Sequence, residues 1–200
     1  MKNKKNIPIK YTSREFNTIK EDLIDYANKI PKGSEENGQT IQGWGTGRHN
    51  HYPTYDIGFD VLGLGDVYKL VSENFLYPAA YFAYKESFSD PDDYLSENFL
   101  VKYEAGTDHI NLPAHFDTSA ISFNISLNED YTGGGCWFTK HQILVKPPMG
   151  YGIIAPGGIS HRHGARSIIT GERYQIVSFI KSRVFDHIVD KENGEQFFYQ

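Results

Sequence analysis

Pro113-Ala-His-Phe-Asp117 places a histidine and a carboxylate two residues apart, among short apolar segments of the kind that form strands. Side chains at positions i and i+2 of a strand point to the same face, so His115 and Asp117 can reach one metal ion while Phe116 points away. A second, distant histidine, His163, completes the set of two histidines and one carboxylate that typically holds Fe(II) with open coordination positions. The pattern therefore predicts an iron centre built on strands.

An arginine follows the three candidate ligands in the sequence. Arg173 lies ten residues after His163 (173 − 163), which is long enough for a strand to leave the metal, turn at Thr170-Gly171-Glu172 and return. A buried guanidinium can bind a carboxylate through two parallel hydrogen bonds. An iron triad combined with such an arginine suits 2-oxoglutarate, whose C1 carboxylate and ketone would chelate the metal while its C5 carboxylate meets Arg173.

Apolar periodicity predicts two helical segments before the strands. The three-to-four spacing of apolar residues predicts a helix over 13–29 and a second helical region over 66–84, broken or kinked at Pro78. In the second region, one apolar face is expected to carry Val67, Leu70, Val71, Phe75 and Leu76. Between the helices, segment 31–55 is expected to be an irregular loop. Its candidates for a substrate lid are Trp44, His49, His51 and Tyr52.

The sequence pattern of the remainder of the chain predicts short strands separated by glycine, proline and asparagine. These are expected over 98–104, 120–127, 136–139, 143–146, 152–155 and 174–180. Several short strands after two helices favour a mainly β fold with flanking helices, namely a double-stranded β-helix or cupin-like jelly roll. We expect one domain over 1–200, with an N-terminal helix and loop (1–50), a catalytic core (52–180) and a C-terminal tail (181–200).

Composition narrows the classes of partner. The formal net charge of −5 argues against a nucleic-acid binder that works by neutralising phosphates. The single cysteine excludes an intramolecular disulfide. No apolar run of signal-peptide or membrane-spanning length is present, so we expect a soluble, cytoplasmic protein with no membrane partner. A viral or bacterial source is compatible with these features.

Six stretches over residues 52–180 resemble, in the same order, the C-terminal catalytic domain of the procollagen-lysine 2-oxoglutarate 5-dioxygenases, or lysyl hydroxylases. The stretches are Tyr52-Pro-Thr-Tyr-Asp-Ile57, Asn98-Phe-Leu-Val-Lys-Tyr103, Pro113-Ala-His-Phe-Asp117, Ser122-Phe-Asn-Ile-Ser-Leu-Asn128, Asp130-Tyr-Thr-Gly-Gly-Gly-Cys136, and Pro156-Gly-Gly-Ile-Ser-His-Arg-His-Gly164 with Gly171-Glu-Arg-Tyr174. The family belongs to the Fe(II)/2-oxoglutarate-dependent dioxygenases and is similar to the prolyl 4-hydroxylases, which typically have a lysine where this chain has Arg173.

The resemblance implies a role for particular residues. The implied iron ligands are His115, Asp117 and His163, and Arg173 is the implied partner of the C5 carboxylate. His161 is the alternative third ligand, since it shares an expected strand face with His163, but the interval to Arg173 matches the family for His163. The positions implied as lining of the cosubstrate pocket are Tyr103, Asn124 and Cys136.

The resemblance also implies an activity, namely hydroxylation of an aliphatic carbon with release of succinate and CO2. The implied cofactors are Fe(II), 2-oxoglutarate and O2, with ascorbate in support. The expected substrate is a lysine side chain in a protein or peptide. The alternatives are a prolyl hydroxylase, an enzyme acting on a free amino acid or other small molecule, and a non-catalytic jelly-roll binding module, such as one on a viral particle. The oligomeric state stays open, a homodimer included.

Overall fold

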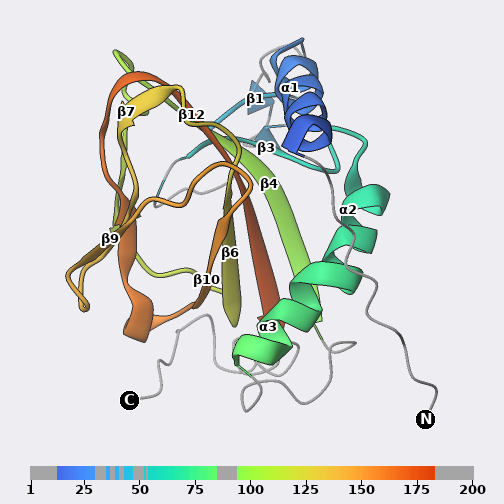
Figure 1. The fold of residues 1–200 in the computed structure, drawn as a ribbon, viewed down its shortest axis with the longest axis vertical. Helices are drawn as coiled ribbons and strands as arrows, with labels where there is room; N and C mark the ends of the chain where they lie inside the picture. The colour runs from blue at the N-terminus through green and yellow to red at the C-terminus, as the bar shows by residue number, and fades with distance from the viewer. Residues whose placement is uncertain are drawn as a thin grey trace.

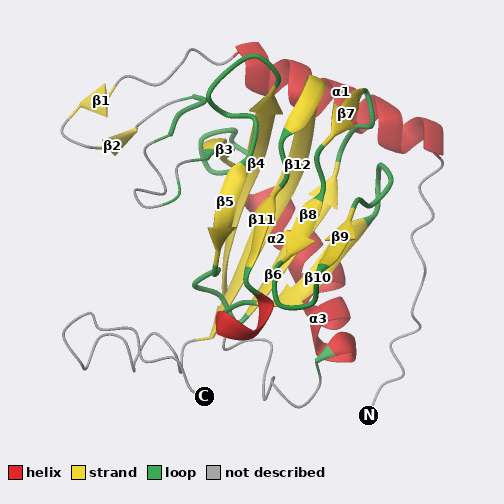
Figure 2. Ribbon diagram, turned by 90° about the vertical axis from the view of Figure 1, so that its left-hand side faces the viewer, coloured by secondary structure: helices red, strands yellow, loops and turns green. Residues whose placement is uncertain are grey.

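The protein is built from two antiparallel sheets that face each other, with helices on the outer side of the larger one (Figures 1 and 2). The computed structural model describes residues 13–29, 35–36, 39–40, 43–46, 52, 54–84 and 94–182. The larger sheet has the strand order β10-β6-β12-β4-β3, with β7 paired to β12, and the smaller has the order β5-β11-β8-β9. This arrangement confirms the predicted mainly β jelly roll with flanking helices.

The strands and helices have the following bounds. The larger sheet contains β3 (Tyr55–Gly58), β4 (Tyr94–Glu104), β6 (Ile121–Ser126), β7 (Tyr131–Gly133), β10 (Gly152–Pro156) and β12 (Ile168–Ser182). The smaller contains β5 (Leu112–His115), β8 (Cys136–Phe138), β9 (Ile143–Val145) and β11 (His163–Ala165). Outside them lie α1 (Ser13–Lys29), α2 (Gly65–Val71), the π-helical turn η1 (Ser72–Leu76), α3 (Tyr77–Ala83), the 3-10 turn η4 (Ile159–His161), and a separate pair, β1 (Glu35–Glu36) and β2 (Gln39–Thr40).

Both faces of the larger sheet are buried. On β4, Leu100 points outward into a core that includes Tyr68, Leu76 and Ala80 of the helices. Its neighbour Val101 points the other way, into a second core between the two sheets. Burial on both faces explains why these strands read as apolar runs rather than as a clean alternation of apolar and polar residues.

The second helical region extends over nearly the predicted length, but its buried face only partly coincides with the predicted one. Its buried stripe is Tyr68, Ser72, Leu76 and Ala80, whereas Leu70 is 61% exposed. The middle turn is a π-helix, and each residue added to a turn rotates the following face by about 100°. The predicted apolar face was therefore wrong for Leu70 and Phe75, which are exposed, and right for Leu76, which is buried, and for Val71, which packs against the same core. Pro78 causes no break, since it lies in the first turn of α3 directly after the π-helical turn, and the helical backbone continues through it.

The predicted turn at Thr170-Gly171-Glu172 is also wrong, because these residues lie inside the long strand β12. The chain leaves β11 and turns at Arg166 and Ser167 instead. Gly171 has a φ of +78°, and a Cβ there would lie 2.3 Å from the carbonyl oxygen of Asp130. At this glycine β12 ends its pairing with β7, and pairing with β4 begins at the next residue. Arg173 therefore lies near the start of a long, doubly paired stretch of strand.

Segment 31–55 contains more structure than the predicted loop. β3 begins at Tyr55, and Trp44 is only 4% exposed, with its ring stacked on that of Tyr55 at 5.6 Å between centroids. Trp44 is therefore a core residue and not part of a lid. His49 and His51 lie outside the described residues. Tyr52 is exposed, and its ring centroid lies 5.1 Å from that of His115.

Candidate metal centre

His115, Asp117 and His163 come together at one end of the smaller sheet. His115 ends β5 and His163 begins β11, and the two residues pair directly across these strands. Asp117 lies two residues beyond the end of β5, so it is not on the strand as predicted, yet its side chain reaches the same place. One ligand atom from each of the three residues lies within 4.8 Å of the others, and no other such group occurs in the described part of the chain.

The two imidazoles are oriented by the backbone. Nδ1 of His115 lies 2.8 Å from the carbonyl oxygen of Pro113, and Nδ1 of His163 lies 2.9 Å from that of His161. When Nδ1 carries the proton and donates it to a carbonyl, Nε2 keeps its lone pair for a metal. The two Nε2 atoms lie 3.2 Å and 3.5 Å from the carboxylate oxygens of Asp117. The arrangement presents two nitrogens and one carboxylate to a single point.

The carboxylate of Asp117 is held in its charged form. Burial by itself would raise the pKa of Asp117, but the hydrogen bond from His115, the nearby His163 and the hydrogen bond from Ser122 outweigh it and lower the pKa. Ser122 donates its hydroxyl proton at 2.5 Å. A buried carboxylate beside two imidazole nitrogens is a suitable environment for a divalent cation, and this donor set fits Fe(II). The three residues could therefore bind iron.

His161 does not join this cluster. It lies in η4, where its ring centroid is 5.3 Å from that of His141 and its Nδ1 is 2.9 Å from the Ser160 hydroxyl. A 3-10 turn breaks the strand-like alternation that would have put His161 on the face of His163. The geometry places His163 rather than His161 beside Asp117.

A cavity of about 480 Å³ lies between the two sheets and contains the triad in its wall. The four residues that the sequence analysis assigned to the cosubstrate site also line it, and they are Tyr103, Asn124, Cys136 and Arg173. Burial raises the pKa of the Cys136 thiol and of the Tyr103 phenol to about 12 in each case. Both groups stay protonated at neutral pH, so Cys136 lacks the thiolate that a nucleophile requires.

Arg173 is a buried cation facing this cavity. Its side chain is 2% exposed, its Nε has no hydrogen-bond partner among the described residues, and its guanidinium carbon lies 5.5 Å from the centroid of the Tyr103 ring. No carboxylate of the described residues forms an ion pair with it. A buried charge is costly unless it is paired. The cavity is therefore suited to a ligand that brings its own anionic group.

Two polar residues of the site have no distinctive sequence signal. Ser122 holds Asp117, and Gln175 lines the cavity on the same strand as Arg173. Gln175 could have been found only from the strand alternation, since it lies two residues after Arg173. Ser122 could not have been found in this way, because its contact joins a strand to the segment after β5.

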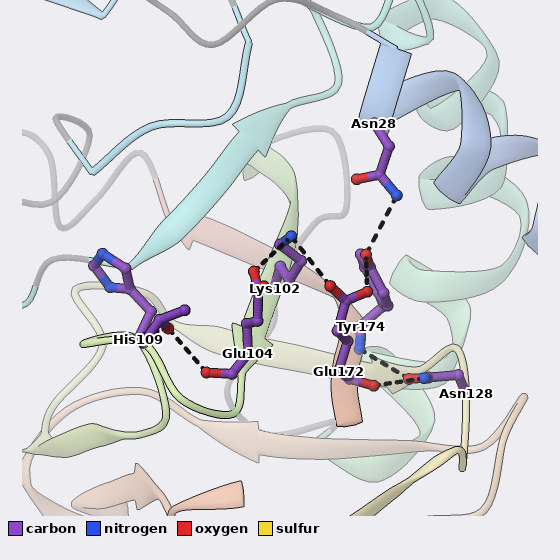
Figure 3. Close-up of polar contacts among 8 residues, drawn as sticks. Asn28, Lys102, Glu104, His109, Asn128, Glu172 and Tyr174 are labelled. Carbon is purple, nitrogen blue, oxygen red and sulfur yellow. Dashed lines mark hydrogen bonds and ion pairs between the residues drawn. The ribbon is translucent and has the colours of Figure 1, made fainter. Parts of the chain in front are cut away.

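A polar network on the outer face of the sheet holds the residues on either side of Arg173 (Figure 3). Lys102 lies 2.9 Å from Glu104 and 3.5 Å from Glu172, and the Tyr174 hydroxyl donates to Glu172 at 2.7 Å. Asn128 donates to the Glu172 carbonyl at 2.7 Å and accepts from the Tyr174 N–H at 2.9 Å. The network holds the backbone of 172–174 on the side of the sheet away from the cavity, so that the Arg173 side chain faces the cavity.

Replacing Asn128 with alanine should lower the free energy of unfolding by about 2 kcal/mol, because a partly buried carbonyl and a buried N–H lose their partner together. Urea denaturation of the wild type and the variant measures this difference. The control is Asn111→Ala, which removes an exposed hydrogen bond to Ser167 and should change the stability by less than about 0.5 kcal/mol. Equal stabilities of the two variants would contradict the role given to Asn128.

The chain is similar in sequence to procollagen-lysine hydroxylases. The chain is 32% identical over 139 residues, or 68% of its length, to procollagen-lysine,2-oxoglutarate 5-dioxygenase 2 of Mus musculus. It is 32% identical over 163 residues, or 80% of its length, to the procollagen lysyl hydroxylase and glycosyltransferase of Acanthamoeba polyphaga mimivirus. The matched stretches are 18% and 17% of those proteins, so this chain spans about a fifth of their length. The similarities confirm the resemblance seen in the sequence.

Solved structures extend the comparison to the fold. The viral collagen prolyl hydroxylase of Paramecium Bursaria Chlorella virus-1, in its 2OG complex, superposes with a TM-score of 0.54 and 15% identity, covering 83% of this chain and 91% of that one. At this identity the likeness establishes the fold alone. No family model matches the chain. Among the described residues, no helix is long and apolar enough to cross a membrane.

Proposed function

From the premise that this chain belongs to the Fe(II)/2-oxoglutarate-dependent dioxygenases and is a relative of the procollagen-lysine 2-oxoglutarate 5-dioxygenases, we propose that it hydroxylates a peptidyl lysine side chain. The observation that carries the proposal is one cavity with a His-Asp-His cluster and a buried, unpaired arginine in its walls. A metal-chelating 2-oxo acid with a distal carboxylate satisfies both features at once. We further propose that the described core forms a single catalytic domain.

Each residue has a distinct task in this proposal. His115, Asp117 and His163 hold the metal through two nitrogens and one oxygen. Arg173 binds the C5 carboxylate of 2-oxoglutarate and sets its orientation. Tyr103, Asn124 and Cys136 line the cosubstrate pocket. When bound, Fe(II), 2-oxoglutarate and O2 supply the oxidising chemistry, which releases succinate and CO2 and delivers one oxygen atom to an aliphatic carbon.

The apolar walls contribute by excluding water. Phe99, Val101 and Val177 from the larger sheet, and Leu112 and Phe138 from the smaller, line the cavity beside the polar groups. A water-poor site strengthens the pairing of Arg173 with a carboxylate. The same walls hold the reacting groups in a fixed orientation, which is the protein's main contribution when a cofactor carries out the reaction.

Lysine is proposed as the target because the two relatives at 32% identity described above carry procollagen-lysine hydroxylase names. A prolyl residue or a free amino acid is the alternative within the same chemistry. A non-catalytic binding module is disfavoured, because such a module would have no use for a buried arginine without a partner.

Peptides test the substrate directly. The purified chain, supplied with Fe(II), 2-oxoglutarate and ascorbate, should convert Gly-X-Lys peptides to products that gain one oxygen on lysine, with one succinate formed per product. Mass spectrometry and succinate assays measure both. Matched peptides with norleucine or proline in place of lysine are the controls. A gain of oxygen on proline alone would replace lysine by proline as the target, and a folded, iron-loaded protein without 2-oxoglutarate turnover would overturn the enzyme proposal.

A further inference from the structure

Tyr52 is an exposed aromatic residue in the wall of the cavity, beside a metal ligand. Its side chain is 39% exposed although it lines the cavity, and its ring centroid lies 5.1 Å from that of His115. Phe116 and Thr118 also line the cavity without being buried. These three residues therefore mark the side on which the cavity opens to solvent next to the metal centre, and we call them the mouth.

The wall of the cavity offers no carboxylate to a cationic substrate. Among the described residues, Asp117 is the only carboxylate that lines it, and this group belongs to the candidate metal centre. Arg173 also lines the cavity, and its positive charge would repel an ammonium group. A charged group that leaves water without a partner is costly. The lysine side chain of the proposed substrate therefore needs a partner that is not an anion.

An aromatic ring can be that partner, because the face of the ring is electron-rich and attracts a cation. Four rings of the wall are buried, and these are Phe99, Tyr103, Phe123 and Phe138. At the mouth, the ring of Phe116 already faces a cation, since the guanidinium carbon of Arg162 lies 5.7 Å from its centroid. Tyr52 is the most exposed ring of the wall, and its contact is with the His115 imidazole.

The place of Tyr52 beside the metal centre suits a lysine in particular. The carbon that is hydroxylated must approach the metal site, and the ammonium group of a lysine is only a few bonds away from any carbon of its side chain. A cation is attracted to a ring within about 6 Å of its centroid. Because Tyr52 contacts the imidazole of a metal ligand, an ammonium group close to the metal site lies within reach of its ring.

We propose that Tyr52 binds the ammonium group of the substrate lysine through a cation–π contact, an inference that rests on the proposed function. The ring attracts a charged side chain but gives no such attraction to a neutral side chain of the same length. Tyr52 is thereby a specificity residue, because it favours lysine over an uncharged residue at the mouth of the cavity.

Calorimetric titration of the anaerobic protein, loaded with Fe(II) and 2-oxoglutarate, tests this proposal with two peptides. One contains Gly-X-Lys, and the other has norleucine, which lacks the ammonium group, in place of lysine. Tyr52→Leu keeps an apolar side chain but removes the ring, and it should weaken binding of the lysine peptide about fivefold, as expected for a partly exposed cation–π contact. Binding of the norleucine peptide should not change. Tyr52→Phe keeps the ring and should bind both peptides within about twofold of the wild type.

The matched control is Tyr151→Leu, the same substitution at a tyrosine that is 68% exposed and lies outside the cavity wall. It should bind both peptides as the wild type does. Unchanged affinity for the lysine peptide in Tyr52→Leu, or an equal loss for both peptides, would overturn the inference and leave the proposed function standing. A wild-type protein that turns over 2-oxoglutarate but neither binds nor oxidises the lysine peptide would overturn lysine as the target and this inference with it.

Discussion

Replacing His163 with alanine should abolish formation of the Fe(II)–2-oxoglutarate chelate, and with it all iron-dependent turnover of 2-oxoglutarate. His163 supplies one of only three donor atoms in the candidate centre, and its Nε2 lies 3.5 Å from the carboxylate of Asp117. Even residues that merely support metal ligands cost about 10- to 100-fold in metal affinity when mutated, so the loss of a ligand should exceed that range. Asp117→Ala and His115→Ala should have the same effect.

Anaerobic titration with Fe(II) and then 2-oxoglutarate measures this loss through the visible metal-to-ligand charge-transfer band. The matched control is His161→Ala, which removes an imidazole only two residues away. Since His161 lies in η4 against His141, its loss should leave the band and the turnover within about twofold of the wild type. Loss of the band in His161→Ala, with the band retained in His163→Ala, would reassign the third ligand.

Arg173→Met should weaken 2-oxoglutarate binding about 100-fold, or ~2.8 kcal/mol, while leaving Fe(II) binding intact. Methionine fills much of the space of the arginine stem but provides no partner for the C5 carboxylate. The stability of the metal-free protein should not fall, because the substitution removes a buried charge that no carboxylate of the described residues neutralises. Calorimetric titration measures the affinity, and thermal denaturation measures the stability.

The control for this variant is Arg166→Met. Arg166 is an exposed arginine in the turn before β12, and its guanidinium carbon lies 6.0 Å from the centroid of the Trp137 ring. Its loss should leave 2-oxoglutarate binding unchanged. Unaltered affinity in Arg173→Met would remove that residue from the cosubstrate site, and a large loss of stability in the metal-free variant would mean that the arginine serves the fold instead.

The reliable sequence predictions were those that depend on local pattern. The helix over 13–29 has the predicted bounds, because its apolar spacing lies within one continuous element. Strands β8, β9 and β10 also lie within a residue of their predicted bounds. β1, β2, β3 and β7, which have two to four residues each, were not predicted.

The errors arose where distant segments meet. The second helical region contains a π-helical turn that its apolar spacing did not predict. Gly171 lies inside β12 rather than in a turn, because this strand pairs with β7 up to Gly171 and with β4 from the next residue onward. Trp44 was considered for a lid because its contact with Tyr55 is not visible in a glycine-rich segment. In each case, the contacts with other parts of the fold outweighed the structure that the local sequence favours.

Residue types and spacing indicated the candidate ligands: a histidine and an aspartate two residues apart, a later histidine and an arginine ten residues beyond it. Which of two nearby histidines meets Asp117 was decided by the pairing of β5 with β11, because cross-strand register brings together residues that are far apart in the chain. The burial of Arg173 and the presence of Gln175 beside it likewise follow from the packing of two sheets. A linear pattern specifies which groups exist, whereas their distances depend on contacts that form only when the whole chain has folded.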